Sequence, residues 1–182
     1  MADNVTKRLF QLLADVLEYP SESLLESTKE CIELLAGRNP EATGEMKAFL
    51  IFAESIGLDE LEETYTRTFD MAPTSNIYAG FFLFGESHKR GLFLVGLEEA
   101  YRKHGFSSGT ELADHLGVVL RFLGVAEDPE FVNPLFGECI LPMLEAMEVD
   151  FKASENGYKH AMRSIRSFLR QESRELVALG GF

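Results

Sequence analysis

Apolar side chains recur at intervals of three and four residues along almost the whole chain, and this spacing restricts the fold more than any other feature. The first such stripe consists of Val5, Leu9, Leu12, Leu13, Val16 and Leu17. A stripe with this spacing lies on one face of a helix and buries that face against its neighbours. No stretch keeps the two-residue alternation that is typical of a half-buried strand. The pattern therefore predicts an all-α protein.

Local start and stop signals divide the chain into segments of helical length. Asn39-Pro40 and Asp128-Pro129 each combine a capping side chain with a proline suited to the first helical position. Ser23 has the form of a capping box, because a glutamate follows it three residues later. We expect helices over about residues 5–17, 23–36, 40–56, 59–72, 87–104, 110–123, 128–147 and 154–179. These eight or nine helices are expected to form one bundle-like domain over residues 1–182.

Two segments depart from this regular pattern. Residues 77–84 are apolar on every side of a helix, so we expect them to be buried on most sides. Pro142 lies inside the segment 128–147, where it removes a backbone donor and clashes with the preceding turn. We expect a kink or break within about four residues before this proline.

The charge balance limits the partners that the chain can bind. Its 17 basic and 30 acidic residues give a formal net charge of −13. A nucleic-acid phosphate binder needs a basic face, so the acidic excess favours a basic partner instead. No apolar run approaches the ~18 residues that span a bilayer, and the polar first residues lack a signal-peptide pattern. We therefore expect a cytoplasmic protein that neither binds nucleic acid nor inserts into a membrane.

The sequence offers no motif for catalysis or for a cofactor. No glycine-rich phosphate loop follows a strand pattern, and the residues around Ser87 lack the second glycine of a nucleophile elbow. Glu111 and His115 could share a helix face, but two ligands do not make a metal site. Cys31 and Cys139 are expected to be core residues. We expect no enzymatic activity, no metal and no cofactor.

Three clusters allow either a structural or a binding interpretation. The basic residues 88–90 stand in a first helical turn and oppose the helix dipole. Either nearby carboxylates such as Glu86 neutralise them, or they face an acidic partner. A basic row from Lys159 to Arg174 is either a solvated face among acidic residues or a binding face. Tyr65 and Phe69 share one face, which either packs in the core or lines a groove.

The segment 111–116 reads Glu-Leu-Ala-Asp-His-Leu and is a further candidate. Leu112 and Leu116 are expected to face the core, with Asp114 pointing away from them. Acidic residues in a first helical turn are ordinary complements of the helix dipole. The same acids beside the titratable side chain of His115 could instead hold an arginine-bearing peptide.

Two sequence blocks resemble a known family. The first runs from Tyr65 to Phe106 and contains Tyr-x-x-Thr-Phe-Asp, a Ser-x-x-Tyr stretch and Gly-Glu-Ser-His-Lys-Arg-Gly. The second is the segment 111–116 with its Asp-His pair. From about Leu12 to Leu169, the chain resembles the cytoplasmic chaperones that mature molybdenum redox enzymes, the nitrate reductase delta subunit among them.

This resemblance implies an all-helical chaperone without catalysis. Such a protein binds the N-terminal, often twin-arginine, leader of a molybdopterin oxidoreductase catalytic subunit. It supports cofactor insertion and assembly before export or membrane docking. The implied peptide-binding residues are Asp114, His115, Glu111, Tyr65, Phe69 and Tyr78.

Physical chemistry agrees with this role but leaves other functions open. An acidic chain with an apolar middle could take up a leader that carries arginines and an amphipathic segment. We expect a contact from Asp114 to a leader arginine to contribute about 1.5–3 kcal/mol, and His115 to make the affinity depend on pH. A generic helical peptide-binding adaptor or regulator shares this logic. A helical metalloenzyme would need paired Glu-x-x-His elements, which the sequence lacks.

Overall fold

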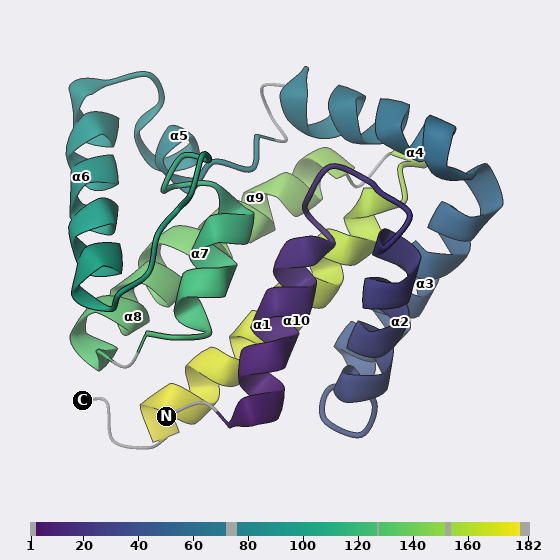
Figure 1. Cartoon of the computed structure of the whole chain (residues 1–182), viewed down its shortest axis with the longest axis horizontal. Coiled ribbons are helices and arrows are strands. Elements are labelled where there is room, and N and C mark those ends of the chain that lie inside the picture. The colour runs from purple at the N-terminus through teal and green to yellow at the C-terminus, as the bar shows by residue number, and fades with distance from the viewer. Residues whose placement is uncertain (1–2, 72–75, 127, 152–153, 179–182) are drawn as a thin grey trace.

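The computed structural model describes residues 3–71, 76–126, 128–151 and 154–178, and Figure 1 shows their arrangement. In chain order the elements are α1 (Asn4–Asp15), α2 (Leu24–Leu35), α3 (Pro40–Ile56), α4 (Leu58–Tyr65), the π-helical η1 (Thr66–Asp70), α5 (Ala79–Phe84), α6 (His88–Lys103), α7 (Leu116–Leu123), α8 (Pro129–Pro134), the π-helical η3 (Leu135–Ile140), α9 (Leu141–Phe151) and α10 (Tyr158–Ala178). Because α4 continues into η1, and α8 through η3 into α9, these described ranges hold nine separate helices. The predicted all-α class is confirmed.

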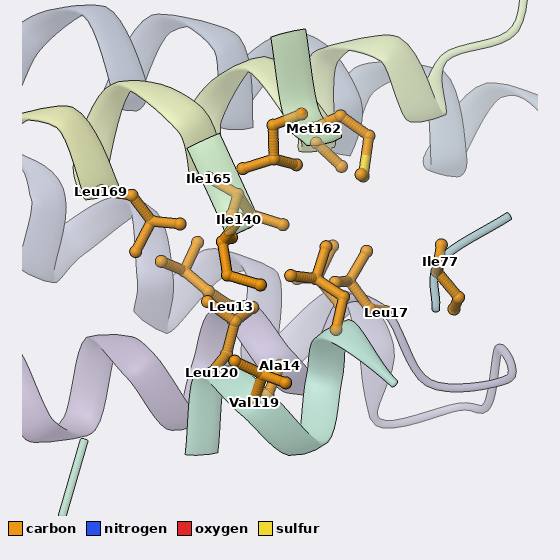
Figure 2. Packing of buried hydrophobic residues seen from close by; sticks show 14 of the residues in the cluster. Leu13, Ala14, Leu17, Ile77, Val119, Leu120, Ile140, Met162, Ile165 and Leu169 are labelled. Carbon is orange, nitrogen blue, oxygen red and sulfur yellow. The ribbon is translucent and has the colours of Figure 1, made fainter. Parts of the chain in front are cut away.

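The core lies where α1, α7, α10 and η3 meet, as Figure 2 shows. Leu13 and Leu17 from the first helical stripe pack there with Leu120 of α7, Ile140 of η3 and Ile165 of α10, and all five side chains are fully buried. Around this centre, α1 packs against α7 and α2, while α10 packs against α3 and α9. The three- and four-residue spacing of apolar side chains thus identified the faces that form the core.

Two predicted helix caps form and one does not. The Asn39 side chain accepts a hydrogen bond from the Ala42 amide at 2.9 Å, and the Asp128 side chain accepts one from the Glu130 amide at 3.1 Å. Ser23 stands before α2 without a capping hydrogen bond, and its hydroxyl lies 3.0 Å from that of a neighbouring serine. The capping box predicted at Ser23 is therefore wrong, because Ser23 has helical backbone angles, with φ −76° and ψ −13°, and not the extended conformation of a capping residue.

The start of α7 also differs from the prediction. We expected a helix from Thr110, but residues 110–114 form turns and bends, and α7 begins at Leu116. The Asp114 carbonyl accepts a hydrogen bond from the amide of Ala79, the first residue of α5, and not from an amide of its own segment as in a helix. Glu111 and Asp114 therefore do not stand in a first helical turn, and complementing a helix dipole does not explain them.

A π-helical segment precedes Pro142. Proline cannot donate to the carbonyl four residues earlier, so the regular α-helical ladder is interrupted on its N-terminal side. The irregular segment η3 ends at Ile140, two residues before the proline, and the helical path continues to Phe151. The predicted irregularity is thus a change of helix type and not a break in the chain's helical course.

The basic row on α10 is bound to α9. Arg163 and Arg166 both pair with Glu148, and Arg170 pairs with Glu145. The acidic partners come from the neighbouring helix, whereas the sequence suggested acids of the 154–179 segment itself. The structural interpretation of this row holds, since these arginines join two helices.

α5 and α6 form a pair at the edge of the molecule, with α6 at the left in Figure 1. Tyr101, near the C-terminal end of α6, is fully buried, and its hydroxyl donates to the Ala113 carbonyl at 2.6 Å. The chain after α6 runs back alongside it toward α5 before α7 begins (Figure 1). Because α5 lies at the edge, Phe82 is 41% exposed and Phe84 is exposed as well. The expectation that residues 77–84 are buried on most sides is therefore wrong for these two phenylalanines.

Candidate functional site

An antiparallel bridge between Tyr78 and His115 joins the two sequence blocks that the family resemblance singled out. The Ala79 amide donates to the Asp114 carbonyl at 2.8 Å, and the Leu116 amide donates to the Ile77 carbonyl at 2.8 Å. These backbone bonds fix the entry to α5 against the entry to α7. Side chains from both segments are thereby brought together.

Asp114 is fully buried and paired with Arg90 of α6. Its carboxylate is 0% exposed, while the arginine side chain is 19% exposed. The guanidinium donates through Nε to Oδ2 at 2.9 Å and through Nη2 to Oδ1 at 3.3 Å. This two-point geometry matches the planar fork of arginine to a carboxylate. The same guanidinium lies 5.7 Å from the ring centroids of both Tyr78 and Phe81, within the range of cation–π attraction.

Gly80 allows α5 to approach this ion pair closely. A Cβ atom at this position would lie 2.7 Å from Asp114 Oδ2, 2.9 Å from Phe93 Cδ1 and 3.2 Å from Arg90 Cγ. The first two distances are shorter than ordinary van der Waals contact. The lack of a side chain at residue 80 is therefore part of the geometry that holds the pair.

His115 caps α7 and is buried beside Tyr78. Its Nδ1 accepts a hydrogen bond from the Gly117 amide at 3.1 Å, so this nitrogen is unprotonated and the ring proton belongs on Nε2. The ring packs edge-on against that of Tyr78, with 5.3 Å between centroids. Burial lowers the pKa of His115 below its ordinary value, although the negative charge of Glu111 acts in the opposite direction. Neutral His115 is thus the form that fits the site.

Glu111 connects the exposed rim of the site to Tyr78. Its Oε1 accepts a hydrogen bond from the Tyr78 hydroxyl at 3.1 Å and another from the Leu112 amide at 2.8 Å. Burial and the neighbouring Glu111 carboxylate raise the pKa of Tyr78 to about 12, so its hydroxyl stays protonated and donates. Glu111 itself is exposed and can meet a partner from solution.

Further carboxylates gather around the same residues. The negative charges of Asp70 and Glu111 contribute to the raised pKa of Tyr78, and those of Glu111 and Glu18 act on the pKa of His115. Asp70, Glu18 and Glu111 are all exposed. Glu18 is already paired with Arg121, which donates to it at 2.6 Å. Asp70 and Glu111 therefore supply the negative potential at the mouth of the site, the exposed surface around Glu111, and this potential attracts cationic groups.

Tyr65 and Phe69 lie in the core and not on the surface of the site. The Tyr65 hydroxyl donates to the Leu17 carbonyl at 2.9 Å, and its ring packs against those of Phe69 and Tyr158 at 5.0 and 5.9 Å. Both residues are buried. Burial raises the pKa of Tyr65, so its hydroxyl stays protonated and donates. Of the two interpretations of this aromatic pair, the structure favours core packing.

The structure brings four of the six sequence-predicted site residues together, namely Asp114, His115, Glu111 and Tyr78. Sequence reasoning missed the roles of Arg90, Gly80 and Phe81. Arg90 stood out as a cation in a first helical turn, but Asp114, and not Glu86, neutralises it. Gly80 also carried a signal, because it is the one glycine within the apolar residues 77–84.

Large apolar side chains are exposed on the elements that carry the site. On α6, Leu92 is 61% exposed and Val95 is 57% exposed. Phe82 and Phe84 of α5 are exposed too, as is Leu112 in the turn before Asp114. The expectation that Leu112 faces the core while Asp114 points away is therefore wrong, because Asp114 is the buried residue of the two. The acidic mouth thus lies on elements that also present apolar side chains to solvent.

The described residues contain neither a cluster of metal ligands nor a membrane-spanning helix. Within residues 3–71, 76–126, 128–151 and 154–178, no group of three or more His, Cys, Asp or Glu side chains could hold a metal ion. Over the same ranges, no helix combines the length and the apolar character needed to cross a bilayer.

Comparisons with known proteins identify the class to which this fold and site belong. Residues 33–132, which include both segments of the site, match the nitrate reductase delta subunit family. A Bacillus subtilis (strain 168) protein named probable nitrate reductase molybdenum cofactor assembly chaperone NarJ is 32% identical over 130 residues, or 68% of this chain and 70% of that protein. The chain belongs to the nitrate reductase delta subunit family.

A solved structure supports the fold. A crystal structure described as that of a redox enzyme maturation protein from Archaeoglobus fulgidus matches 93% of this chain and 96% of its own, with a TM-score of 0.64 and 21% identity. The family match and the curated relative confirm the resemblance drawn from the two sequence blocks, and the solved structure confirms the all-helical architecture. The curated relative is named as an assembly chaperone, in agreement with the role expected from the sequence.

Proposed function

We propose that this protein is a cytoplasmic maturation chaperone that binds the N-terminal leader of a molybdopterin oxidoreductase catalytic subunit and supports cofactor insertion and assembly. It acts without catalysis, as one domain over residues 1–182. One observation carries the proposal. The two segments that resemble the family meet at the Tyr78–His115 bridge and build an acidic, aromatic site. The curated relative is itself named as an assembly chaperone for molybdenum cofactor.

The chemistry of the site suits a leader with arginines and an apolar segment. Asp70 and Glu111 supply exposed negative charge that attracts a basic segment and orients it. Exposed apolar side chains on α5 and α6 offer contact to the apolar face of an amphipathic helix. Asp114 and His115 lie deeper, and Tyr65 and Phe69 support the site from the core below.

The sharpest test replaces Glu111, because this carboxylate is exposed and has no basic partner among its hydrogen bonds. Isothermal titration calorimetry with the N-terminal peptide of the nitrate reductase catalytic subunit from the same organism measures the affinity. Glu111→Lys should weaken binding about ten-fold, because it turns an attraction into a repulsion at the mouth of the site. The loss should shrink as the salt concentration rises.

Two controls make this result specific. Glu33→Lys changes the net charge equally but lies exposed on α2, away from α5 and α6 in Figure 1, and should bind as the parent does. A scrambled peptide of the same composition should bind more weakly than the leader. If Glu111→Lys and Glu33→Lys bind the leader with equal affinity, the leader does not bind at this site. Equal binding of the scrambled peptide would favour a generic peptide-binding adaptor.

A further inference from the structure

The contact between Arg90 and Asp114 has the chemistry of an arginine ligand in its receptor. A fully buried carboxylate accepts two hydrogen bonds from the guanidinium, at 2.9 and 3.3 Å. Tyr78 and Phe81 place their rings against the same cation. A carboxylate fork combined with aromatic faces selects guanidinium over ammonium, since lysine has neither the planar fork nor the stacking surface.

The first half of the helix that supplies Arg90 contains residues that weaken a helix, although Phe93 and Leu94 pack against the core. Lys89 and Arg90 stand at the positive end of the helix dipole, where cations are unfavourable. Gly91 and Gly96 are exposed, and a Cβ atom at either position would have nothing within 4 Å, so no packing demand explains these helix-weakening glycines. The first half of α6 is attached by the ion pair of Arg90 and by the apolar contacts of Phe93 and Leu94, while the Tyr101 hydroxyl anchors the second half.

We propose that Asp114, Tyr78 and Phe81 form a guanidinium-binding site that Arg90 occupies in the free protein, and that an arginine of the client leader takes the place of Arg90. This inference rests on the proposed function, because the incoming arginine belongs to the leader. The exchange never leaves the Asp114 carboxylate buried and unpaired, the state that makes removal of one partner of such a pair so costly. It releases the first half of α6 while Tyr101 retains the second half.

The exchange lowers the apparent affinity of the free protein for the leader. A site that its own arginine fills is available to a partner only during the fraction of time in which it is open. Removal of Arg90 should therefore tighten leader binding, the opposite of what loss of an ordinary structural residue does. Arg90→Lys should have an intermediate effect, because lysine keeps the charge but competes poorly for a two-point, stacked site.

Calorimetric titration with the same N-terminal peptide tests this order. Arg90→Met should bind the peptide at least ten-fold more tightly than the parent, with Arg90→Lys between them. Arg163→Met is the matched control, because Arg163 of α10 is a similarly half-buried arginine whose carboxylate partner, Glu148 of α9, is not a residue of the proposed site. It should bind as the parent does. Adding Asp114→Asn to Arg90→Met should abolish the gain.

A second measurement tests the guanidinium site without the leader. Ethylguanidinium should raise the melting temperature of Arg90→Ala but not that of the parent or of the Arg90→Ala, Asp114→Asn double variant. If Arg90→Ala does not fold alone, the readout is recovery of its helical circular dichroism when ethylguanidinium is added. Peptide binding to the parent should also speed hydrogen exchange of the amides of residues 88–96 and spare those of residues 97–103.

The outcomes separate the inference from the proposed function. If the parent and Arg90→Met bind the peptide equally, or Arg90→Met binds more weakly, the exchange is overturned and leader binding stands. If no variant binds the peptide, the proposed function and the exchange both fail, while ethylguanidinium rescue still reports on the site itself. Failure of ethylguanidinium to stabilise or restore Arg90→Ala overturns the guanidinium site.

Discussion

Gly80→Ala tests how closely α5 must approach the ion pair beneath it. Replacing a helical glycine by alanine ordinarily stabilises a protein by up to about 1 kcal/mol. Here the new methyl group would lie 2.7 Å from Asp114 Oδ2 and 2.9 Å from Phe93 Cδ1. Asp114 is held by two hydrogen bonds from Arg90 and cannot move aside without weakening them. Overpacking costs about 1–3 kcal/mol, so with two displaced groups we expect a net loss of about 2 kcal/mol in the free energy of unfolding.

Urea unfolding followed by far-ultraviolet circular dichroism measures this loss. The midpoint should fall while the slope stays unchanged, as befits a change of stability alone. Gly96→Ala is the matched control, because a Cβ atom there meets nothing within 4 Å. It should gain about 0.5–1 kcal/mol. If Gly80→Ala is as stable as the parent, or gains as much as Gly96→Ala, the close approach of α5 does not constrain residue 80.

Three further predictions concern titration and the aromatic core. Burial raises the pKa of Glu172 to about 7, against 4.5 in the unfolded chain, so stability should fall as the pH rises through this window. In urea titrations, Glu172→Gln should raise the free energy of unfolding by roughly 1 kcal/mol near pH 8, after allowance for solvent screening, and leave it unchanged near pH 4. Burial lowers the pKa of His115, so the stability it contributes should be lost as the pH falls below about 6.5. His115→Asn keeps a capping acceptor but cannot titrate, so its melting temperature should fall less than the parent's as the pH is lowered. An equal fall in both proteins would show that His115 does not cause this pH dependence. Tyr65→Phe removes the bond to the Leu17 carbonyl and should cost about 1 kcal/mol without changing peptide affinity in calorimetry; weaker binding would make Tyr65 a contact residue.

The helices could be predicted from the sequence because their determinants are local. The apolar stripe on α1 and the Asn39 cap of α3 act within one or two turns of the chain, and both appear in the structure. The start of α7 could not be predicted in this way. We expected the helix to begin at Thr110, but the Asp114 carbonyl is bonded to the amide of Ala79, the first residue of α5, and no local pattern predicts such a bridge.

The site was predictable in its residues but not in its contacts. Asp114 was expected to face an incoming arginine from solution, yet the structure places it fully buried against Arg90, which lies 24 positions earlier in the chain. The sequence marked Arg90 as a cation that opposes a helix dipole, and Asp114 as either a dipole complement or a contact for an arginine-bearing peptide. Their pairing depends on how α6 lies against the 111–116 segment, which is a tertiary fact. Whether Asp114 meets a leader arginine stays a prediction.

The crowding of Gly80, Arg90 and Asp114 into one small volume also bears on how the sequence can change over generations. Replacing Asp114 alone leaves the guanidinium unpaired, and replacing Arg90 alone leaves a buried carboxylate unpaired. Each single substitution therefore destabilises the fold, whereas replacing both residues together does not. A descendant that had exchanged both for apolar side chains would be free to carry a larger residue at position 80. Across an alignment of relatives, the three positions should therefore be inherited and lost together, as a single character.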